Sequence, residues 1–299
     1  MVDKRKSQKT SDRVSVVIPV RNCRDLIDVQ LEAIAAQSYK GELEVIVSDN
    51  GSTDGLAQHI HEHPLRDELR IVYVDSSARQ GPAHARNEGA KCASGNFLAF
   101  CDADDRVHPD WIARLRELAE EFDVVGGCVR NAFVELAQDS KLGPLSLARR
   151  AGESFHALYG RRQSRVPRRG FRALGGMNED LRGSEDVDFV WRAQLEGYSF
   201  GFLREALVGV RLRQTGRDLW KQGRALGYGS AQLLSLHRGV GAPGIALTTF
   251  LRHLAVLVVQ NPLLPVMLTR MPRARWGLLL AVDLGMLHGG IKFKVLTLW

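Results

Sequence analysis

The chain has few cysteines and no long uninterrupted apolar run. Its four cysteines show no zinc-type spacing, and two of them lie in apolar, strand-like segments. This usage predicts reduced thiols in a cytoplasmic protein rather than a disulfide framework. Two apolar segments near the C-terminus, 251–271 and 276–291, are broken by charged, polar and proline residues. Neither supplies the ~20 clean residues that a membrane-spanning helix needs.

The chain also lacks a zinc finger, a helix-turn-helix and an aromatic RNA-binding signature. Its net charge of +7 is concentrated after residue 129, largely in arginines. Such a basic region suits anionic lipid or a phosphorylated small substrate, and nucleic acid is not expected as a partner. The first thirteen residues are polar and basic without an apolar run, so we expect a loose tail and not a signal peptide.

Strand and helix patterns alternate through the first part of the chain, which has 299 residues, 44% of them hydrophobic. Runs of β-branched and apolar residues predict strands, and apolar residues three and four apart predict helices. The expected strands cover 14–18 (ending at Pro19), 44–47, 69–74, 97–101 and 124–125, and the expected helices cover 27–34 and 111–122. This alternation predicts a mainly parallel α/β sheet that binds ligands beyond the carboxyl ends of its strands.

Three carboxylates follow the buried strand 97–101 directly: Asp102, Asp104 and Asp105. Clustered acids at a sheet edge offer the oxygen ligands that Mg²⁺ or Mn²⁺ prefers, usually shared with substrate phosphates. The alternative is an acidic turn that caps the helix beginning near Pro109. Asp49 follows another strand, so we expect Asp49, Asp102 and Asp104 to converge on one crevice.

Several segments resemble, in order, the motifs of family 2 glycosyltransferases. They are SVVIPVRN (15–22), VSDNGSTDG (47–55), GPAHARN (81–87), ASGNFLAFCDADD (93–105), FRALGGMNE (171–179) and GSEDVDF (183–189). The resemblance covers roughly residues 14 to 235. It implies a GT-A fold, in which a Rossmann-like nucleotide-binding half is fused to an acceptor-binding half.

The resemblance also divides the chain. We expect a polar tail over 1–13, a nucleotide-sugar-binding half over 14–128 and an acceptor-binding, catalytic half over 129–235. A helical extension follows over 236–299. Its apolar residues within 278–287, flanked by Arg273, Arg275, Lys292 and Lys294, suit a helix lying in a membrane surface. The alternative is a helical pair packed on the catalytic domain or on a second subunit of a homo-oligomer.

In the family, the acid after the second strand reads the nucleotide base, and here that residue is Asp49. A carboxylate can accept the imide N–H of uracil. The alternative is an Asx-turn or a helix cap, because the turn signal Asn-Gly-Ser follows. Pro19, Val20 and Asn22 would line the same pocket. Arg86 would pair with the base or the diphosphate, or else be an arginine on a helix surface.

By the same resemblance, Asp102 faces the ribose or donor sugar. Asp104, with Asp102, would hold the Mn²⁺ or Mg²⁺ that bridges the two phosphates. We expect Asp105 to cap a helix, and the alternative is that it is a second metal ligand. Many relatives carry a histidine after the strand that follows the base helix. This chain has Arg211 and Arg213 in that region, and guanidinium groups could neutralise the diphosphate directly, which would relax the need for a metal.

Asp186 matches the aspartate that acts as general base in the family, whose members typically invert the anomeric centre in one displacement. The alternative is that Asp186 only caps the helix that follows, whose packed face is Val187, Val190 and Trp191. Glu185 would position the acceptor or the loop. The Gln-x-x-Arg-Trp signature of processive synthases is missing, so we expect one sugar per encounter.

The expected activity is therefore that of an inverting, metal-dependent hexosyltransferase. It would move a sugar from a nucleotide-diphosphate donor, expected to be a UDP-sugar, to a hydroxyl of a lipid-linked or cell-envelope glycan. The expected location is the cytoplasm, at the inner face of the membrane. A nucleotidyltransferase that releases pyrophosphate is one alternative. A non-catalytic nucleotide-sugar or glycan scaffold is another, although the intact set of acids argues against it.

Overall fold

A computed structural model of the chain describes residues 13–131, 165–181, 183–211, 215–242, 245–262 and 272–297. The chain divides into two compact units. The first comprises Met1–Glu179 and Asp186–Leu212, and the second comprises Asp180–Glu185 and Arg213–Trp299.

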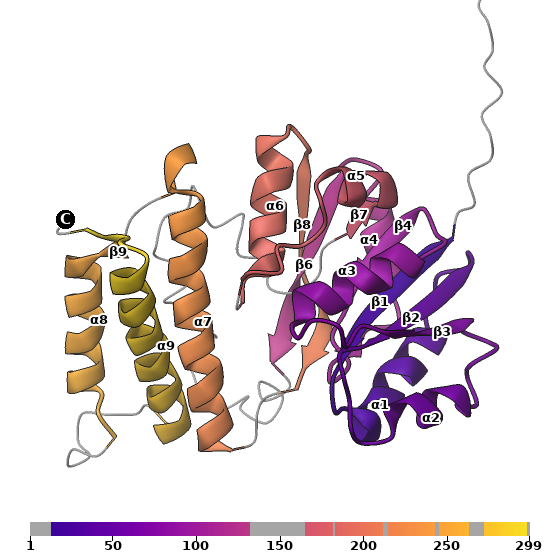
Figure 1. Cartoon of the computed structure of the whole chain (residues 1–299), viewed down its shortest axis with the longest axis horizontal. Helices are drawn as coiled ribbons and strands as arrows, with labels where there is room; N and C mark the ends of the chain where they lie inside the picture. Colours follow the sequence, from indigo (N-terminus) through magenta and orange to yellow (C-terminus); the bar gives the residue numbers. More distant parts are fainter. Residues whose placement is uncertain are drawn as a thin grey trace, which may run out of the picture. The chain divides into compact units, whose positions relative to one another are not determined.

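The described strands of the first unit form one sheet in the order β3-β2-β1-β4-β7-β6-β8-β5 (Figure 1). Their bounds are β1 Val14–Val20, β2 Leu43–Asp49, β3 Ile71–Asp75, β4 Phe97–Phe100, β5 Arg106–Val107, β6 Val124–Asn131, β7 Arg165–Pro167 and β8 Phe200–Val210. β3, β2, β1 and β4 are parallel, β7 is antiparallel to both its neighbours, and β8 is parallel to β6. The predicted mixed α/β architecture with a parallel centre is thus confirmed.

Helices cover both faces of this sheet because its central strands are apolar on both sides (Figure 1). Val16 and Ile18 of β1 pack toward α1, α2 and α4, whereas Val17 packs toward α3, α5 and α6. The helix bounds are α1 Arg24–Ala35, α2 Leu56–His61, α3 Pro82–Cys92, α4 Trp111–Leu118, α5 Arg168–Ala173 and α6 Glu185–Leu195. The predicted helix face of Ile27, Leu31 and Ile34 is fully buried.

The bounds of all five expected strands differ from the structure at one end or both, and two of these differences have a local cause. β1 does not stop at Pro19 but continues to Val20. Proline is tolerated there because β4 pairs with β1 only as far as Val17, so Pro19 has a single neighbouring strand. β3 begins at Ile71 rather than at 69, because Arg70 has a positive φ of 48° and lies in a turn.

The second unit is built on helices α7 Gly216–Leu236, α8 Leu247–Val259 and α9 Arg273–Lys292. A 3₁₀ turn, Arg238–Val240, and the short strands β9 Ile245–Ala246 and β10 Leu296–Thr297 complete it. α7 and α9 pack closely: a Cβ at Gly227 would collide with the backbone carbonyl of Val282. Trp276 of α9 donates its indole N–H to the carbonyl of Leu257 on α8 (2.8 Å).

Besides Asp180–Glu185, this unit contains the segment from Arg213 onward, in which α7 packs along α9. The expected extension over 236–299 covers the later part of that segment. Among the described helices, none is long and apolar enough to cross a membrane.

Glu44 fastens the start of the sheet to the turn before β4. Glu44 is only 6% exposed. Its carboxylate accepts hydrogen bonds from the Ser15 hydroxyl, from the backbone N–H and the hydroxyl of Ser94 (2.6 Å each) and from the backbone N–H of Gly95 (3.1 Å). Burial alone would raise the pKa of Glu44, but these hydrogen bonds outweigh it and lower the pKa. The stabilisation is therefore present at neutral pH and is lost as the pH falls through the folded-state pKa.

Glu44→Ala should lower the free energy of unfolding by about 2–3 kcal/mol, because it leaves the buried Ser15 hydroxyl without its acceptor and removes the hydrogen bonds from Ser94 and Gly95. Urea denaturation at pH 7 measures the change. Glu42→Ala is the matched control: that carboxylate is about half exposed and pairs with Arg13 and Arg70 at the surface, so its loss should matter much less. Equal effects from the two substitutions would contradict this account of Glu44.

Candidate nucleotide-sugar site

The sheet register brings the predicted acids to one edge. Asp49 is the last residue of β2 and lies opposite Val20 of β1, while Phe100 of β4 lies opposite Val17. Asp102, two residues beyond Phe100, therefore reaches the same edge on the other side of β1. Since neighbouring strands are about 4.8 Å apart, β2 and β4 are separated by roughly 10 Å, with β1 between them.

Asp49 is only 5% exposed and both of its carboxylate oxygens are engaged. Oδ1 accepts the backbone N–H of Ser52 (2.8 Å) and Oδ2 accepts the hydroxyl of Tyr73 (2.7 Å). Burial and the hydrogen bond to Asp49 raise the pKa of Tyr73, so the phenol keeps its proton and remains a donor. Each carboxylate oxygen still has a lone pair for a further donor, so the Asx-type turn and a base-reading role are compatible.

The loop after β1 is fastened to the turn after Asp49. Asn22, whose φ is +51°, accepts the N–H of Thr53 with its side-chain oxygen (2.8 Å) and donates its own N–H to the Ser52 hydroxyl (2.9 Å). Val20 is buried and Pro19 is partly exposed in the preceding strand. These contacts hold Pro19, Val20 and Asn22 beside the turn that carries Asp49.

Arg86 of α3 pairs with Asp102. Its Nη2 lies 2.6 Å from Asp102 Oδ1, and the two side chains are 9% and 19% exposed. The alternative of an arginine on a helix surface is therefore wrong, because Arg86 is buried against the edge acid. The pair also means that one Asp102 oxygen is already committed to a guanidinium.

Asp104 is partly buried, whereas Asp105 is almost fully buried. Asp105 does not cap a helix as expected, because α4 begins only at Trp111; instead its Oδ1 accepts the backbone N–H of Arg211 (3.4 Å). Arg211 follows β8 directly and is exposed. Its bond to Asp105 places it next to the acidic segment 102–105. Arg213 lies outside the described residues.

Asp102 and Asp104 supply two carboxylates at this edge. Within the described part of the chain, no third His, Cys, Asp or Glu joins them in a group of ligand atoms within 4.8 Å of one another. A cation here would take its remaining ligands from water or from a diphosphate. This oxygen-only, incomplete donor set fits Mg²⁺ or Mn²⁺, which typically share their coordination with substrate phosphates.

Asp186 is the second residue of α6 rather than the residue that precedes it. Its Oδ1 accepts the N–H of Val187 (2.9 Å), in the first turn of the helix. Glu185, the first residue of α6, is buried and belongs to the second unit. The predicted buried face of α6 (Val187, Val190 and Trp191) is confirmed, and Gly197 follows the helix with a φ of +85°.

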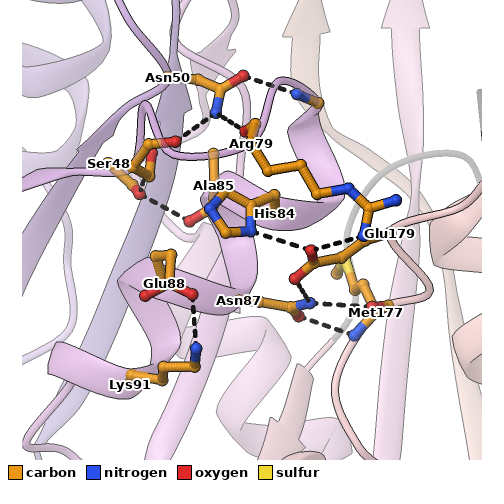
Figure 2. Close-up of polar contacts among 12 residues, drawn as sticks. Ser48, Asn50, Arg79, His84, Ala85, Asn87, Glu88, Lys91, Met177 and Glu179 are labelled. Carbon is orange, nitrogen blue, oxygen red and sulfur yellow. Dashed lines mark hydrogen bonds and ion pairs between the residues drawn. The ribbon is translucent and has the colours of Figure 1, made fainter.

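A polar cluster joins α3 to the segment that precedes α6, as Figure 2 shows. The amide of Asn87 donates to Met177 O (2.9 Å) and to Glu179 Oε1 (2.8 Å), and its oxygen accepts Met177 N (2.8 Å). His84 Nδ1 and Arg79 Nη1 contact Glu179 Oε2 at 3.0 and 3.3 Å. Burial raises the pKa of Glu179, but the hydrogen bonds from Asn87 and His84 outweigh it and lower that pKa.

Residues 174–179 are also held from the side of α6. Arg192 donates to the carbonyls of Leu174 (2.6 Å) and Gly176 (2.7 Å), and its Nε pairs with the buried Asp188 (2.8 Å). Gly176 has a φ of +73°, and a Cβ there would lie 2.6 Å from the amide oxygen of Asn87. Thus α3 and α6 both fix the segment that leads toward Asp186.

Sequence reasoning did not assign a role to Tyr73, Asn87 or Glu179. Asn87 and Glu179 lie inside quoted motifs, but their contact joins positions 92 residues apart. The only local signal for Tyr73 is its place two residues before the end of a strand beside β2.

Among solved structures, the fold is similar to that of the mannosyltransferase PcManGT from Pyrobaculum calidifontis, determined in complex with GDP-Man and Mn²⁺. The TM-score is 0.62 at 20% identity, over 93% of this chain and 88% of that one. At this identity the likeness establishes the GT-A fold alone.

Sequence relatives are more informative. The chain is 30% identical to glycosyltransferase AglE of Haloferax volcanii over 242 residues, 75% of each protein. It is 37% identical over 92 residues to the UDP-Glc:alpha-D-GlcNAc-diphosphoundecaprenol beta-1,3-glucosyltransferase WfaP of Escherichia coli, covering 31% of this chain and 35% of WfaP. The model of glycosyl transferase family 2 matches residues 15–170. With its GT-A sheet and acid-bearing edge, the chain belongs to glycosyl transferase family 2.

Proposed function

We propose that this enzyme moves one sugar from a UDP-sugar to a hydroxyl group of a lipid-linked or cell-envelope glycan, with inversion at the sugar carbon. The observation that carries the proposal is the shared edge of β2 and β4, where a fixed Asp49 and the acids at 102–104 flank β1. Binding of a nucleoside diphosphate needs such an arrangement. A hydrogen-bond acceptor at one end binds the base, and a cation or a guanidinium group at the other end binds the phosphates.

Asp49 is the proposed reader of the base. The Ser52 N–H and the Tyr73 hydroxyl hold its carboxylate in one orientation, so its remaining lone pairs point in a defined direction. Preorganised acceptors lose little entropy when a ligand binds. The imide N–H of uracil is the donor we propose, and the name of the related WfaP enzyme, which includes UDP-Glc, supports that choice.

Asp102 and Asp104 have different proposed roles. Because Arg86 engages one oxygen of Asp102, that side chain suits the ribose or donor sugar better than a metal. Asp104 is then the principal ligand of a divalent cation, which would offset the negative charge that the diphosphate gains as it leaves. The exposed guanidinium of Arg211, next to Asp105, would add positive charge on the same side.

Asp186 is the proposed general base. In an inverting displacement, the acceptor hydroxyl attacks C1 of the sugar as the bond from C1 to the diphosphate oxygen breaks. The hydroxyl proton passes to the Asp186 carboxylate, and the nucleoside diphosphate leaves on the opposite face. Release of UDP, and not of pyrophosphate, distinguishes this reaction from nucleotidyl transfer.

The second unit supports an acceptor at a membrane surface. Leu251, Leu254 and Val258 are spaced i, i+3, i+7 on α8, and each is between 40 and 58% exposed. From residue 215 to the end, the sequence has ten Lys and Arg but only two Asp and Glu. An apolar helix face in a strongly basic unit is typical of binding to anionic lipid.

Asp186→Asn should slow sugar transfer by at least ~100-fold while leaving the affinity for UDP unchanged, because it removes the base but not the donor site. Turnover and calorimetric UDP titration of the same preparation measure the two effects. Asp188→Asn, two residues along α6, is the comparison: it breaks a buried pair with Arg192 and should lower stability. Normal turnover by Asp186→Asn would remove the proposed base.

Leu254→Gln together with Val258→Gln should weaken binding to vesicles containing anionic lipid by at least ~10-fold, because each change exposes a polar group where an apolar one enters the interface. Vesicle co-sedimentation measures the loss. Val29→Gln, at an apolar position 48% exposed on α1, is the control and should bind like the unaltered protein. Equal sedimentation of all three proteins would exclude α8 as the membrane contact.

A further inference from the structure

A second cluster of potential ligands lies on the helices α1 and α2, and it shares no residue with the acids at 102–104. Asp28 is on α1, His59 is near the end of α2, and His63 follows α2 by two residues. His59 Nε2 lies 2.6 Å and His63 Nε2 lies 3.4 Å from Asp28 Oδ1. One ligand atom from each residue falls within 4.8 Å of the others.

The cluster is neither fully buried nor fully open. The side chain of His63 is 4% exposed, that of His59 24% and that of Asp28 45%. Both histidines line a cavity of about 330 Å³. Its other lining residues are Arg24, Gly55, Gln58, Glu62 and Pro64. A cavity of this size has room for a water molecule as an additional ligand.

We infer that Asp28, His59 and His63 form a site for a divalent transition metal of the zinc class, separate from the donor-site cation. Two imidazoles and one carboxylate suit Zn²⁺, Ni²⁺ or Cu²⁺, whereas the oxygen-only edge at Asp102 and Asp104 suits Mg²⁺ or Mn²⁺. The metal would join α1 to the end of α2, and thereby to the turn that carries Asp49 and leads into α2.

The hydrogen bonds that His63 makes without a metal lower the affinity that we expect for the metal. The backbone N–H of Leu65 donates to His63 Nδ1 (3.1 Å), so a neutral His63 carries its proton on Nε2, facing Asp28. Metal binding requires the lone pair of Nε2, so the proton must leave it and the bond from Leu65 is lost. We therefore expect an affinity for the metal about 10- to 100-fold below that of a site without this competing bond.

The test uses the full-length protein without a polyhistidine tag and with Asp104→Asn, which removes the proposed donor-site ligand. Zn²⁺ calorimetry and the visible absorption of bound Co²⁺ should both show one saturable equivalent. His59→Gln or His63→Gln in the same background should weaken this binding by at least ~100-fold. His61→Gln, an exposed histidine on the same helix, is the matched control and should leave it unchanged.

Circular dichroism of each variant confirms folding before titration, and Asp28→Asn provides a third test that changes no histidine. Weakened Zn²⁺ binding by Asp28→Asn, with native secondary structure, supports the site. Absence of saturable Zn²⁺ binding, or equal binding by His59→Gln and His61→Gln, would overturn it. The three side chains would then serve only as a hydrogen-bonded link between α1 and α2.

Discussion

Two adjacent residues of α3 connect the parts of the site. Arg86 pairs with Asp102 at the sheet edge, and Asn87 makes three hydrogen bonds to residues 177 and 179, on the segment that leads to α6. Both side chains come from one helix, so Asp102 at the sheet edge and the segment that leads to α6 are held by a single element. A displacement of α3 would disturb both sets of contacts. The contact between Asn87 and residue 176 is close, because a Cβ at Gly176 would collide with the Asn87 side chain.

That helix is in turn placed by the alternation of the central strands. Val17, Ile46, Leu98 and Phe100 face α3, α5 and α6, while their neighbours in sequence face α1, α2 and α4. Since a shift of one residue would exchange the two faces, the strand register is strongly determined. The same register brings Asp49 and Asp102 to one edge, so packing of the core and placement of the acids have a common cause.

The sequence was sufficient to predict the features that local residue patterns determine. β-branched runs predicted the parallel strands, and ordered motifs pointed to the acids at the strand ends. It was misleading where tertiary context decides: β1 runs through Pro19 because β4 has already ended, and Asp105 contacts Arg211 rather than a helix N-terminus. The sequence could not predict the hydrogen bond between Asn87 and Glu179, which joins residues 92 positions apart. Nor could it predict the hydrogen bond that the Tyr73 hydroxyl donates to Asp49. Such contacts depend on how elements pack and leave no periodic signal.

The most direct measurement is a calorimetric titration of the full-length protein with UDP, with and without Mn²⁺, repeated with Asp104→Asn. The account predicts micromolar binding of UDP that depends on Mn²⁺ and is strongly weakened by Asp104→Asn. Tight binding that does not need the metal would transfer the diphosphate role to arginines such as Arg211. Absence of binding to UDP, GDP and dTDP in the presence of Mn²⁺ would contradict the assignment of this sheet edge as the donor site.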